Sequence, residues 1–498
     1  MTQAIGRRVF LSGVAALALT TPALANAPLR SLKPVGRGGE RPLPTPESAA
    51  TIIDKARLDG QVGCAVARSA DGALLESVEG AEALPPASCA KALTAAYALD
   101  ALGADYRFET QLITTGVISE QGVVKGDLVL AGGGDPTLDT DGLATLARQL
   151  KAAGVTAVEG RFLVWGGSLP FSPMIDAAQP DHVGYNPAIS GLNLNFNRVH
   201  FEWKRSGNGY AVTMDARSAA HRPKVRMARM AVEARSVPVY TYADRGGRDD
   251  WTVARGALGN GGARWLPVRK PELYAGEVFE AFARSQGISL KAPEVSDVAP
   301  DGVVLTRLES APLDEILRDM LRFSTNLTAE VVGQQATRAR LGRAPESLKA
   351  SADAMNDWAR TSLGMDRPAL VDHSGLGDAS RISAQDMVTG LLALKDTPLK
   401  SLMKPFPMRD SERRIIENHP LSVQAKTGTL NFVSGLAGFV DLPNGEELVF
   451  AVFSANFDRR NALSKAQRER PDGGRTWNRR AKALQQALIE RWGAVYVG

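Results

Sequence analysis

Cysteine is scarce in this chain, with only Cys64 and Cys89 among 498 residues. Small secreted folds that are held together by disulfides need a much higher cysteine content, so a disulfide scaffold is excluded. An oxidising compartment would still permit one bridge between the two thiols. We expect two buried free thiols instead.

Long hydrophobic runs are missing beyond the N-terminal segment. No later stretch approaches the ~20 continuous apolar residues of a membrane-spanning helix, so no transmembrane span is expected. The composition, with 44% hydrophobic and 23% charged residues, is ordinary for a soluble globular protein. Because 498 residues exceed the roughly 250 to 300 at which a single core stops growing, two or more domains are predicted.

Signatures of nucleic-acid and nucleotide binding are also missing. The formal net charge is +5, but the basic residues are dispersed and are not interleaved with aromatic residues, so no nucleic-acid partner is expected. The glycine-rich stretch Gly132–Asp135 lacks the following Gly-Lys-Ser/Thr of a phosphate loop. It is interpreted as a turn.

The N-terminal segment has the three parts of an export signal. Arg7 and Arg8 are followed by an apolar run over 9–19 and by a small-residue site that ends at Ala25. This pattern predicts a signal peptide over 1–25 and a periplasmic protein. The Arg-Arg-x-Phe-Leu order resembles a twin-arginine signal, and an ordinary Sec leader is the alternative. The Gly/Pro-rich residues 26–45 are expected to form a linker.

Strand patterns occur near both ends of the remaining chain. Residues 62–80 contain the alternating Val62, Cys64 and Val66 and an Asp71-Gly72 turn, which predicts a β-hairpin after a short helix over 48–58. Three strand-like stretches follow in the C-terminal third, at 421–430, 434–442 and 447–456, and Pro443-Asn444-Gly445 predicts a hairpin between the last two. A closing helix is predicted from the helical spacing of apolar residues, namely Trp477, Ala481, Leu484, Leu488 and Trp492. Together they predict one antiparallel sheet assembled from both termini.

The middle of the chain, 105–300, then has to be an insertion. It carries strand signals of its own at 126–132 and 159–167 and a helical stretch at 139–154. No repeat of fixed period is present. We therefore predict a second folding unit within the first.

Ser88 and Lys91 suggest a nucleophile with its base. They lie three residues apart at the start of an alanine-rich helical stretch, and residues at this spacing share a helix face. If that face is desolvated, the neutral amine of Lys91 becomes accessible and can take the proton of the Ser88 hydroxyl. Taken alone, a Ser-x-x-Lys spacing also occurs by chance on the surface of ordinary helices.

Two later motifs strengthen this interpretation. Ser324-Thr325-Asn326 lies between two helical segments, and Lys426-Thr427-Gly428-Thr429 lies on a predicted strand. The ordered set Ser-x-x-Lys, Ser-x-Asn and Lys-Thr-Gly is the signature of penicillin-binding proteins and class A β-lactamases. Taken singly, Ser324 could be a helix cap and Lys426 a solvated strand end.

The resemblance extends beyond the motifs. Residues 46–498 resemble the D-alanyl-D-alanine carboxypeptidase/endopeptidase family, the class C low-molecular-mass penicillin-binding proteins, most clearly at 84–99, 126–138, 307–330, 372–383 and 426–440. It implies an α/β (α+β) fold with a β-lactamase/transpeptidase-like domain, an antiparallel sheet flanked by helices. This discontinuous catalytic domain would comprise 46–104 and 301–498, with inserted accessory domains over 105–300.

The resemblance also implies roles for the catalytic side chains. Ser88 attacks the carbonyl of the penultimate D-alanine, and Lys91 takes its proton. Ser324 relays a proton to the leaving D-alanine with the help of Lys426. Asn326 holds the substrate amide and the Lys91 side chain.

Strand residues are expected to bind the substrate. The hydroxyls of Thr427 and Thr429 hold the terminal carboxylate, and the backbone N–H groups of Ser88 and Thr429 form the oxyanion hole. Gly428, which lacks a side chain, lets the substrate backbone lie close to the strand. Neither a metal nor a cofactor is expected.

The chain departs from the family pattern at two positions. Cys89 follows the nucleophile where the family often has a polar residue, and His373 stands where glycine is expected. Neither change removes a catalytic atom. His373 could contact substrate, although a structural role is favoured.

The predicted function is therefore a periplasmic serine-type D-Ala-D-Ala carboxypeptidase/endopeptidase that acts on peptidoglycan peptides and binds β-lactams covalently. A serine β-lactamase-like hydrolase is the first alternative, disfavoured because a small drug requires no large insertion. A catalytically quiet envelope-binding protein is the second, disfavoured by the intact serine and lysine set. The oligomeric state and the balance of the two peptidase activities stay open.

Overall fold

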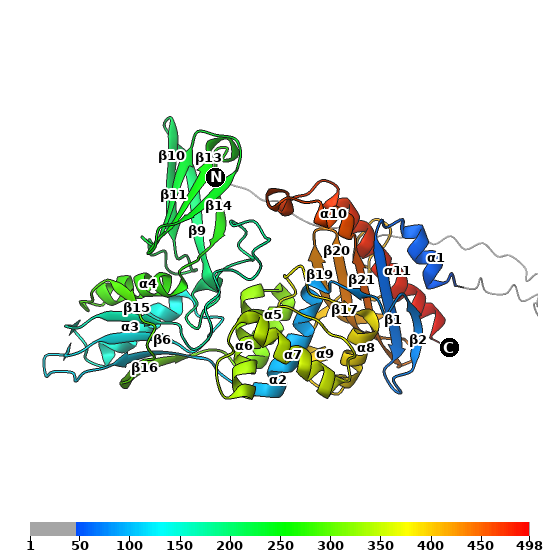
Figure 1. Ribbon diagram of the computed structural model, residues 1–498, viewed down its shortest axis with the longest axis horizontal. Coiled ribbons are helices and arrows are strands. Elements are labelled where there is room, and N and C mark those ends of the chain that lie inside the picture. The colour runs from blue at the N-terminus through cyan, green and yellow to red at the C-terminus, as the bar shows by residue number, and fades with distance from the viewer. Residues whose placement is uncertain (1–45, 498) are drawn as a thin grey trace, which may run out of the picture. The chain divides into compact units, whose positions relative to one another are not determined.

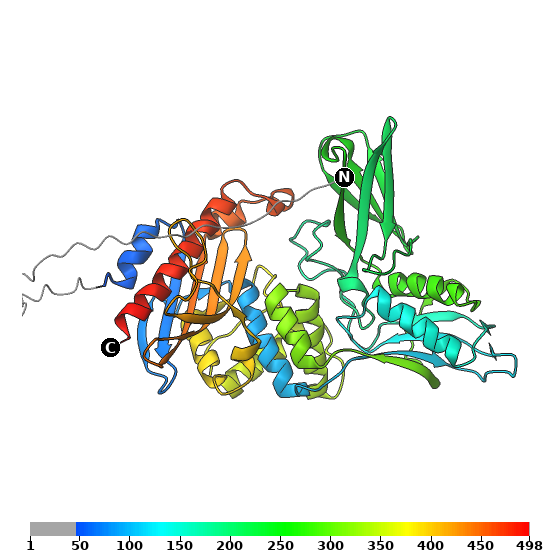
Figure 2. The same cartoon turned by 180° about the vertical axis from the view of Figure 1, so that it is seen from behind.

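The computed structural model describes residues 46–497 (Figures 1 and 2). The predicted signal peptide, 1–25, and linker, 26–45, lie outside the described residues. None of the helices within 46–497 is long and apolar enough to cross a membrane.

A six-stranded sheet joins the two ends of the described chain, as the sequence predicts. All five strand pairs are antiparallel. The order is β18 (Lys404–Pro405), β19 (Ser422–Leu430), β20 (Val433–Asp441), β21 (Glu447–Ala455), β1 (Gln61–Arg68) and β2 (Leu74–Val78).

The predicted hairpins are formed by turn glycines. Gly72 has φ of 72° and its N–H bonds to the carbonyl of Arg68 over 2.9 Å. Gly445 has φ of 87° and bonds in the same way to Leu442 over 3.0 Å. A left-handed conformation is easy only for glycine, so these two residues fix the pairing of β1 with β2 and of β20 with β21.

Helices cover both faces of this sheet, and alternation along β1 shows why. Cys64 and Val66 lie in a core with α1 (Ala49–Ala56) and α11 (Gly474–Val495), whereas Ala65 and Ala67 lie in another core with the remaining helices. Figures 1 and 2 show the sheet between the two groups. The second group is α2 (Ala90–Leu102), α5 (Leu313–Phe323), α6 (Asn326–Leu341), α7 (Leu348–Leu363), α8 (Ala384–Ala393) and α9 (Leu399–Leu402).

The middle of the chain builds a separate five-stranded sheet. Its order is β15 (Pro293–Val295), β8 (Phe162–Trp165), β6 (Leu128–Gly132), β4 (Glu109–Thr114) and β16 (Val303–Glu309). Helices α3 (Thr140–Ala152) and α4 (Pro271–Ser285) share a hydrophobic core with it. The sheet extends past residue 300, where the sequence analysis ended the insertion, because β16 pairs with β4.

Two smaller sheets of three strands each complete this region. One is β10 (Gly209–Asp215), β9 (Arg198–Ser206) and β14 (Gly261–Pro267), and the other is β11 (Ala228–Glu233), β13 (Asp249–Ala254) and β12 (Tyr240–Asp244). Short pairs join β17 (Ile382–Ser383) to β3 (Ala83–Leu84) and β5 (Val123–Val124) to β7 (Ala157–Val158). The remaining helices are α10 (Phe457–Asn461) and the 3-10 turns η1 (Ala87–Cys89), η2 (Asn195–Asn197), η3 (Arg255–Ala257) and η4 (Lys465–Glu469).

Candidate active site

Ser88 lies on η1, the tight turn that leads into α2. The preceding Ala87 has φ of 46°, a conformation that costs free energy for any residue with a Cβ atom. The surrounding structure must therefore stabilise the Ala87 conformation, and neighbouring backbone segments that pack closely against the turn do so. A Cβ atom on Gly375 would lie 1.9 Å from the Ala87 carbonyl oxygen, and one on Gly428 would lie 2.5 Å from that of Pro86.

This packing corrects the interpretation of Gly428. The sequence predicts that its missing side chain makes room for the substrate backbone. A Cβ atom there would instead meet the nucleophile turn, including the Ser88 nitrogen at 3.1 Å. Gly428 therefore lets β19 lie directly against the turn that carries Ser88.

Lys91 is fully buried one helical turn after Ser88. Its Nζ lies 2.9 Å from Ser88 Oγ, 2.8 Å from Asn326 Oδ1 and 2.8 Å from the Ser374 carbonyl oxygen. Burial, and next the positive charge of Lys426, lower the pKa of Lys91 to about 7. A large fraction of the amine is therefore neutral at neutral pH, as a base for Ser88 requires.

Lys426 supports the second serine. Its Nζ donates to Ser324 Oγ over 2.9 Å and to the Thr427 carbonyl over 2.9 Å. Burial lowers the pKa of Lys426 to about 8. Ser324 ends α5 with φ of 59°, and Asn326 begins α6. The break between these two helices places both side chains toward the nucleophile.

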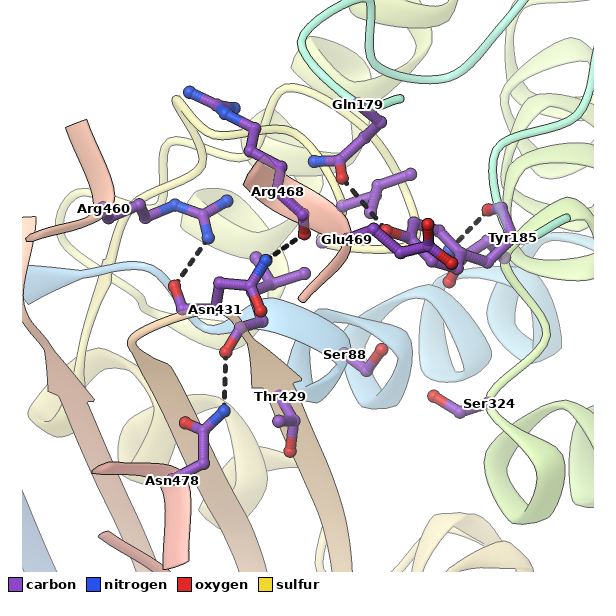
Figure 3. A pocket seen from close by; sticks show the side chains of 14 residues that line it. Ser88, Gln179, Tyr185, Ser324, Thr429, Asn431, Arg460, Arg468, Glu469 and Asn478 are labelled. Atoms are coloured by element: carbon purple, nitrogen blue, oxygen red, sulfur yellow. Dashed lines mark hydrogen bonds between the residues drawn. The ribbon is translucent and has the colours of Figure 1, made fainter. Parts of the chain in front are cut away.

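Residues of the three motifs meet around one cavity of about 350 Å³. Ser88, Ser324, Asn326 and Thr429 line it, and Figure 3 shows the two serine hydroxyls turned toward each other. Lys91 and Lys426 lie buried behind the serines. Thr427 is exposed on β19 but does not line this cavity.

The residues on the other side of the cavity lie outside the sequence motifs. Gln179 and Tyr185 reach it from the middle of the chain, and Arg468 and Glu469 from η4 (Figure 3). The Asn326 side-chain amide donates to the Tyr185 carbonyl over 2.8 Å. None of these residues belongs to a motif, and no local pattern marks them.

Glu469 ties η4 to the middle of the chain. Its carboxylate lies 2.7 Å from His182 Nε2 and 2.9 Å from Arg264. The hydrogen bond with His182, followed by those with Arg264, lowers the pKa of Glu469 to about 2. The wall of the cavity is thus an ion-paired junction between segments that are distant in sequence.

His373 has the structural role that the sequence favours. It is fully buried, and its Nε2 lies 2.8 Å from Ser351 Oγ. Burial lowers the pKa of His373 to about 3, so the ring is neutral. A Cβ atom on Gly333 would lie 2.2 Å from this ring, so glycine in α6 provides its space.

Both cysteines are free and buried, which confirms the prediction. Burial raises the pKa of each thiol to about 12. The Cys89 thiol donates to the Lys426 carbonyl over 3.1 Å. This contact joins the nucleophile turn to β19, a link that the family's usual polar residue could also make.

Two D-alanyl-D-alanine carboxypeptidases are similar to this chain over most of its length. The chain is 29% identical over 465 residues to the D-alanyl-D-alanine carboxypeptidase of Actinomadura sp. (strain R39), covering 87% of this chain and 83% of that protein. It is 24% identical over 422 residues to the D-alanyl-D-alanine carboxypeptidase DacB of Haemophilus influenzae, covering 79% and 85% of the two chains.

A solved structure has the same fold. The crystal structure of penicillin binding protein 4 from Haemophilus influenzae matches with a TM-score of 0.73 at 19% identity, over 90% of this chain and 99% of that one. The model of the D-Ala-D-Ala carboxypeptidase 3 (S13) family matches residues 47–477. This match spans most of the described chain and includes every motif residue of the site, and the chain therefore belongs to the D-Ala-D-Ala carboxypeptidase 3 (S13) family, a family of serine peptidases.

Proposed function

We propose that this protein hydrolyses the D-Ala-D-Ala ends of peptidoglycan stem peptides through an acyl-enzyme on Ser88, and that penicillins acylate the same atom. The main support for this proposal is the 2.9 Å contact between Ser88 Oγ and Lys91 Nζ. Ser88 lines a cavity that Ser324, Asn326 and Thr429 also line. Family membership and the carboxypeptidase relatives support the substrate class.

Acylation begins with the neutral amine of Lys91. It takes the proton of Ser88 as Oγ forms a bond to the carbonyl carbon of the penultimate D-alanine. We assign the oxyanion hole to the backbone N–H groups of Ser88 and Thr429, two residues that line the cavity. Asn326 holds both Lys91 and the neighbouring wall through its two side-chain hydrogen bonds.

Departure of D-alanine requires a proton on its nitrogen. Ser324 gives its own proton to that nitrogen as the C–N bond breaks, and the proton taken by Lys91 replaces it. Lys426, 2.9 Å from Ser324 Oγ, stabilises the charge on this hydroxyl during the transfer. Water then hydrolyses the ester, with Lys91 as base again, and frees Ser88.

The substrate carboxylate is assigned first to Thr429. Its hydroxyl is on the exposed face of β19 and the residue lines the cavity, whereas Thr427 lies outside the lining. Thr427, exposed two residues earlier on the same face of β19, supplies the second hydroxyl of this carboxylate site. Lys426 adds positive charge beside Thr427, whose carbonyl oxygen accepts from Lys426 Nζ over 2.9 Å.

The domain division is proposed with one adjusted boundary. A catalytic domain comprises 46–104 and the chain from about residue 310 onward, because β16 pairs with the inserted strand β4. The inserted domains contribute Gln179 and Tyr185 to the cavity, so they are expected to influence which peptides enter. Peptide crosslinks, cut in an endopeptidase reaction, would use the same acyl-enzyme.

Purified protein tests this function with a peptide ending in D-Ala-D-Ala and with crosslinked muropeptides. We expect release of D-alanine from the first and of monomers from the second, both blocked by prior treatment with penicillin. Absence of both products in assays with folded protein contradicts the proposal. Fast turnover of penicillin without a lasting adduct would instead identify a β-lactamase.

The site of action is proposed to be the periplasm, reached by the twin-arginine route. Arg7 and Arg8 carry this proposal, and the cell-wall substrate supports it. Changing both to lysine is expected to leave the precursor in the cytoplasm, as seen by cell fractionation and precursor size. Normal export of the Lys-Lys variant would indicate the Sec route.

A further inference from the structure

Two buried carboxylates near Lys91, those of Glu330 and Asp372, have no role in the proposed mechanism. Glu330 is on α6, four residues after Asn326, and residues at this spacing lie on the same side of a helix. Asn326 already contacts Lys91. Glu330 therefore lies behind the base, on the helix that supplies one of its partners.

Glu330 holds a second partner of the base through the backbone. Its two carboxylate oxygens accept hydrogen bonds from the N–H groups of His373, over 3.0 Å, and Ser374, over 2.9 Å. The carbonyl oxygen of Ser374 in turn accepts from Lys91 Nζ over 2.8 Å. Apart from Ser88, both partners of Lys91 Nζ are thus fixed by α6, one by its Asn326 side chain and one through Glu330.

We propose that Glu330 is a positioning residue for Lys91: it fixes the Ser374 carbonyl that holds the amine, and its carboxylate balances charge beside the base. This inference rests on the proposed role of Lys91. It assigns Glu330 no contact with substrate.

The charges around Lys91 define the direction of the effect. Lys426 on β19 lowers the pKa of Lys91, whereas Glu330, Asp372 in the loop after α7, and Cys89 on η1 raise it. Asp372 is itself held by the N–H groups of Gly375 and Gly377, each over 2.6 Å. Burial and the nearby Asp372 raise the pKa of Glu330, but both of its oxygens accept hydrogen bonds from backbone N–H groups, and these bonds together with the charge of Lys91 hold the carboxylate in its ionised form. Loss of the Glu330 charge should therefore lower the pKa of Lys91.

The test measures the rate at which labelled penicillin acylates Ser88 at a series of pH values. In the unchanged protein the rate should fall below about pH 7, where Lys91 becomes protonated. Glu330→Gln keeps the size of the side chain but removes its charge and one acceptor. We expect the midpoint of this acid limb, the pH at which the rate is half of its plateau value, to fall by about one pH unit. The plateau rate should fall about tenfold, because one backbone N–H loses its charged partner.

Two further variants separate charge from geometry. Glu330→Asp keeps the charge but shortens the reach, so its midpoint should stay while its plateau rate falls. Asn356→Ala is the matched control: Asn356 is a buried anchor of the same loop and holds both backbone groups of Leu370, over 3.0 and 2.8 Å. It should lower the melting temperature without moving the midpoint.

An unmoved midpoint in folded Glu330→Gln overturns the inference and leaves Glu330 as an ordinary structural residue. If the glutamine variant does not fold, an unchanged plateau rate in Glu330→Asp overturns it as well. Failure of the proposed function looks different, because the unchanged protein would then form no adduct on Ser88.

Discussion

Ser88→Ala is expected to abolish the covalent penicillin adduct and the release of D-alanine while the protein stays folded. The variant lacks the only oxygen that attacks, so the rate should fall on the order of 10⁶-fold, as when the nucleophile of another serine hydrolase is removed. Stability should change little. The Ser88 hydroxyl is only partly buried, and its one side-chain hydrogen bond is the contact with Lys91.

Intact-mass spectra and thermal melting check this result. Ser324→Ala is the matched control, because it removes a hydroxyl from the same cavity but leaves the nucleophile and its base. Ser324→Ala should still be labelled on Ser88, more slowly. An adduct that survives in Ser88→Ala would place the nucleophile elsewhere and contradict the assignment.

The sheet of the catalytic part could be predicted because its pattern is local. Alternating side chains mark β1, short strand-like apolar stretches mark β20 and β21, and the turn glycines Gly72 and Gly445 determine which strands are neighbours. The pairing of β1 with β21 joins distant parts of the chain, and it followed from placing both groups of strands in one sheet. The helix α11 was evident from one apolar stripe.

The catalytic motifs could also be predicted from the sequence, but the residues that surround them could not. Ser88 and Lys91 share a helix face, so their contact is readable from spacing. Glu330 and Tyr185 approach Lys91 and Asn326 only through tertiary packing, and neither residue stands in a short pattern. Gly428 was recognised as a glycine that permits a close approach, but the approaching backbone belongs to the nucleophile turn, which spacing along β19 cannot show.

The sheet of the middle region extends past the predicted boundary at residue 300 for a related reason. β16 follows a proline-containing loop and was grouped with the helices after it, because the sequence analysis assigned no strand between 301 and 312. Its pairing with β4, almost 200 residues earlier, is a long-range contact. Edge strands of this kind have only weak alternation, with exposed residues on both sides.

Lys91→Met is expected to lower the acylation rate by about 10² to 10⁴-fold, the usual contribution of a positioned general base. Methionine has similar length and no charge, and the site is fully buried, so the replacement suits its surroundings in volume. The loss leaves the Asn326 side-chain oxygen and the Ser374 carbonyl without the amine. Each unpaired acceptor costs about 1 to 3 kcal/mol of stability, which a shift in melting temperature should show.

The pH dependence separates loss of the base from loss of fold. In the unchanged protein Lys91 is protonated below its pKa of about 7, so acylation should slow as the pH falls through this value. The methionine variant has no amine to titrate, and its slow residual acylation should lack this limb.

Lys426→Met is the comparison variant. It removes the other buried amine, which has a pKa of about 8, and it should keep an acid limb because Lys91 is still present. The acid limb of this variant should lie at higher pH, since the positive charge that lowers the pKa of Lys91 is gone. Acylation of Lys91→Met within tenfold of the unchanged rate, or with the same limb, would mean that another group takes the proton of Ser88.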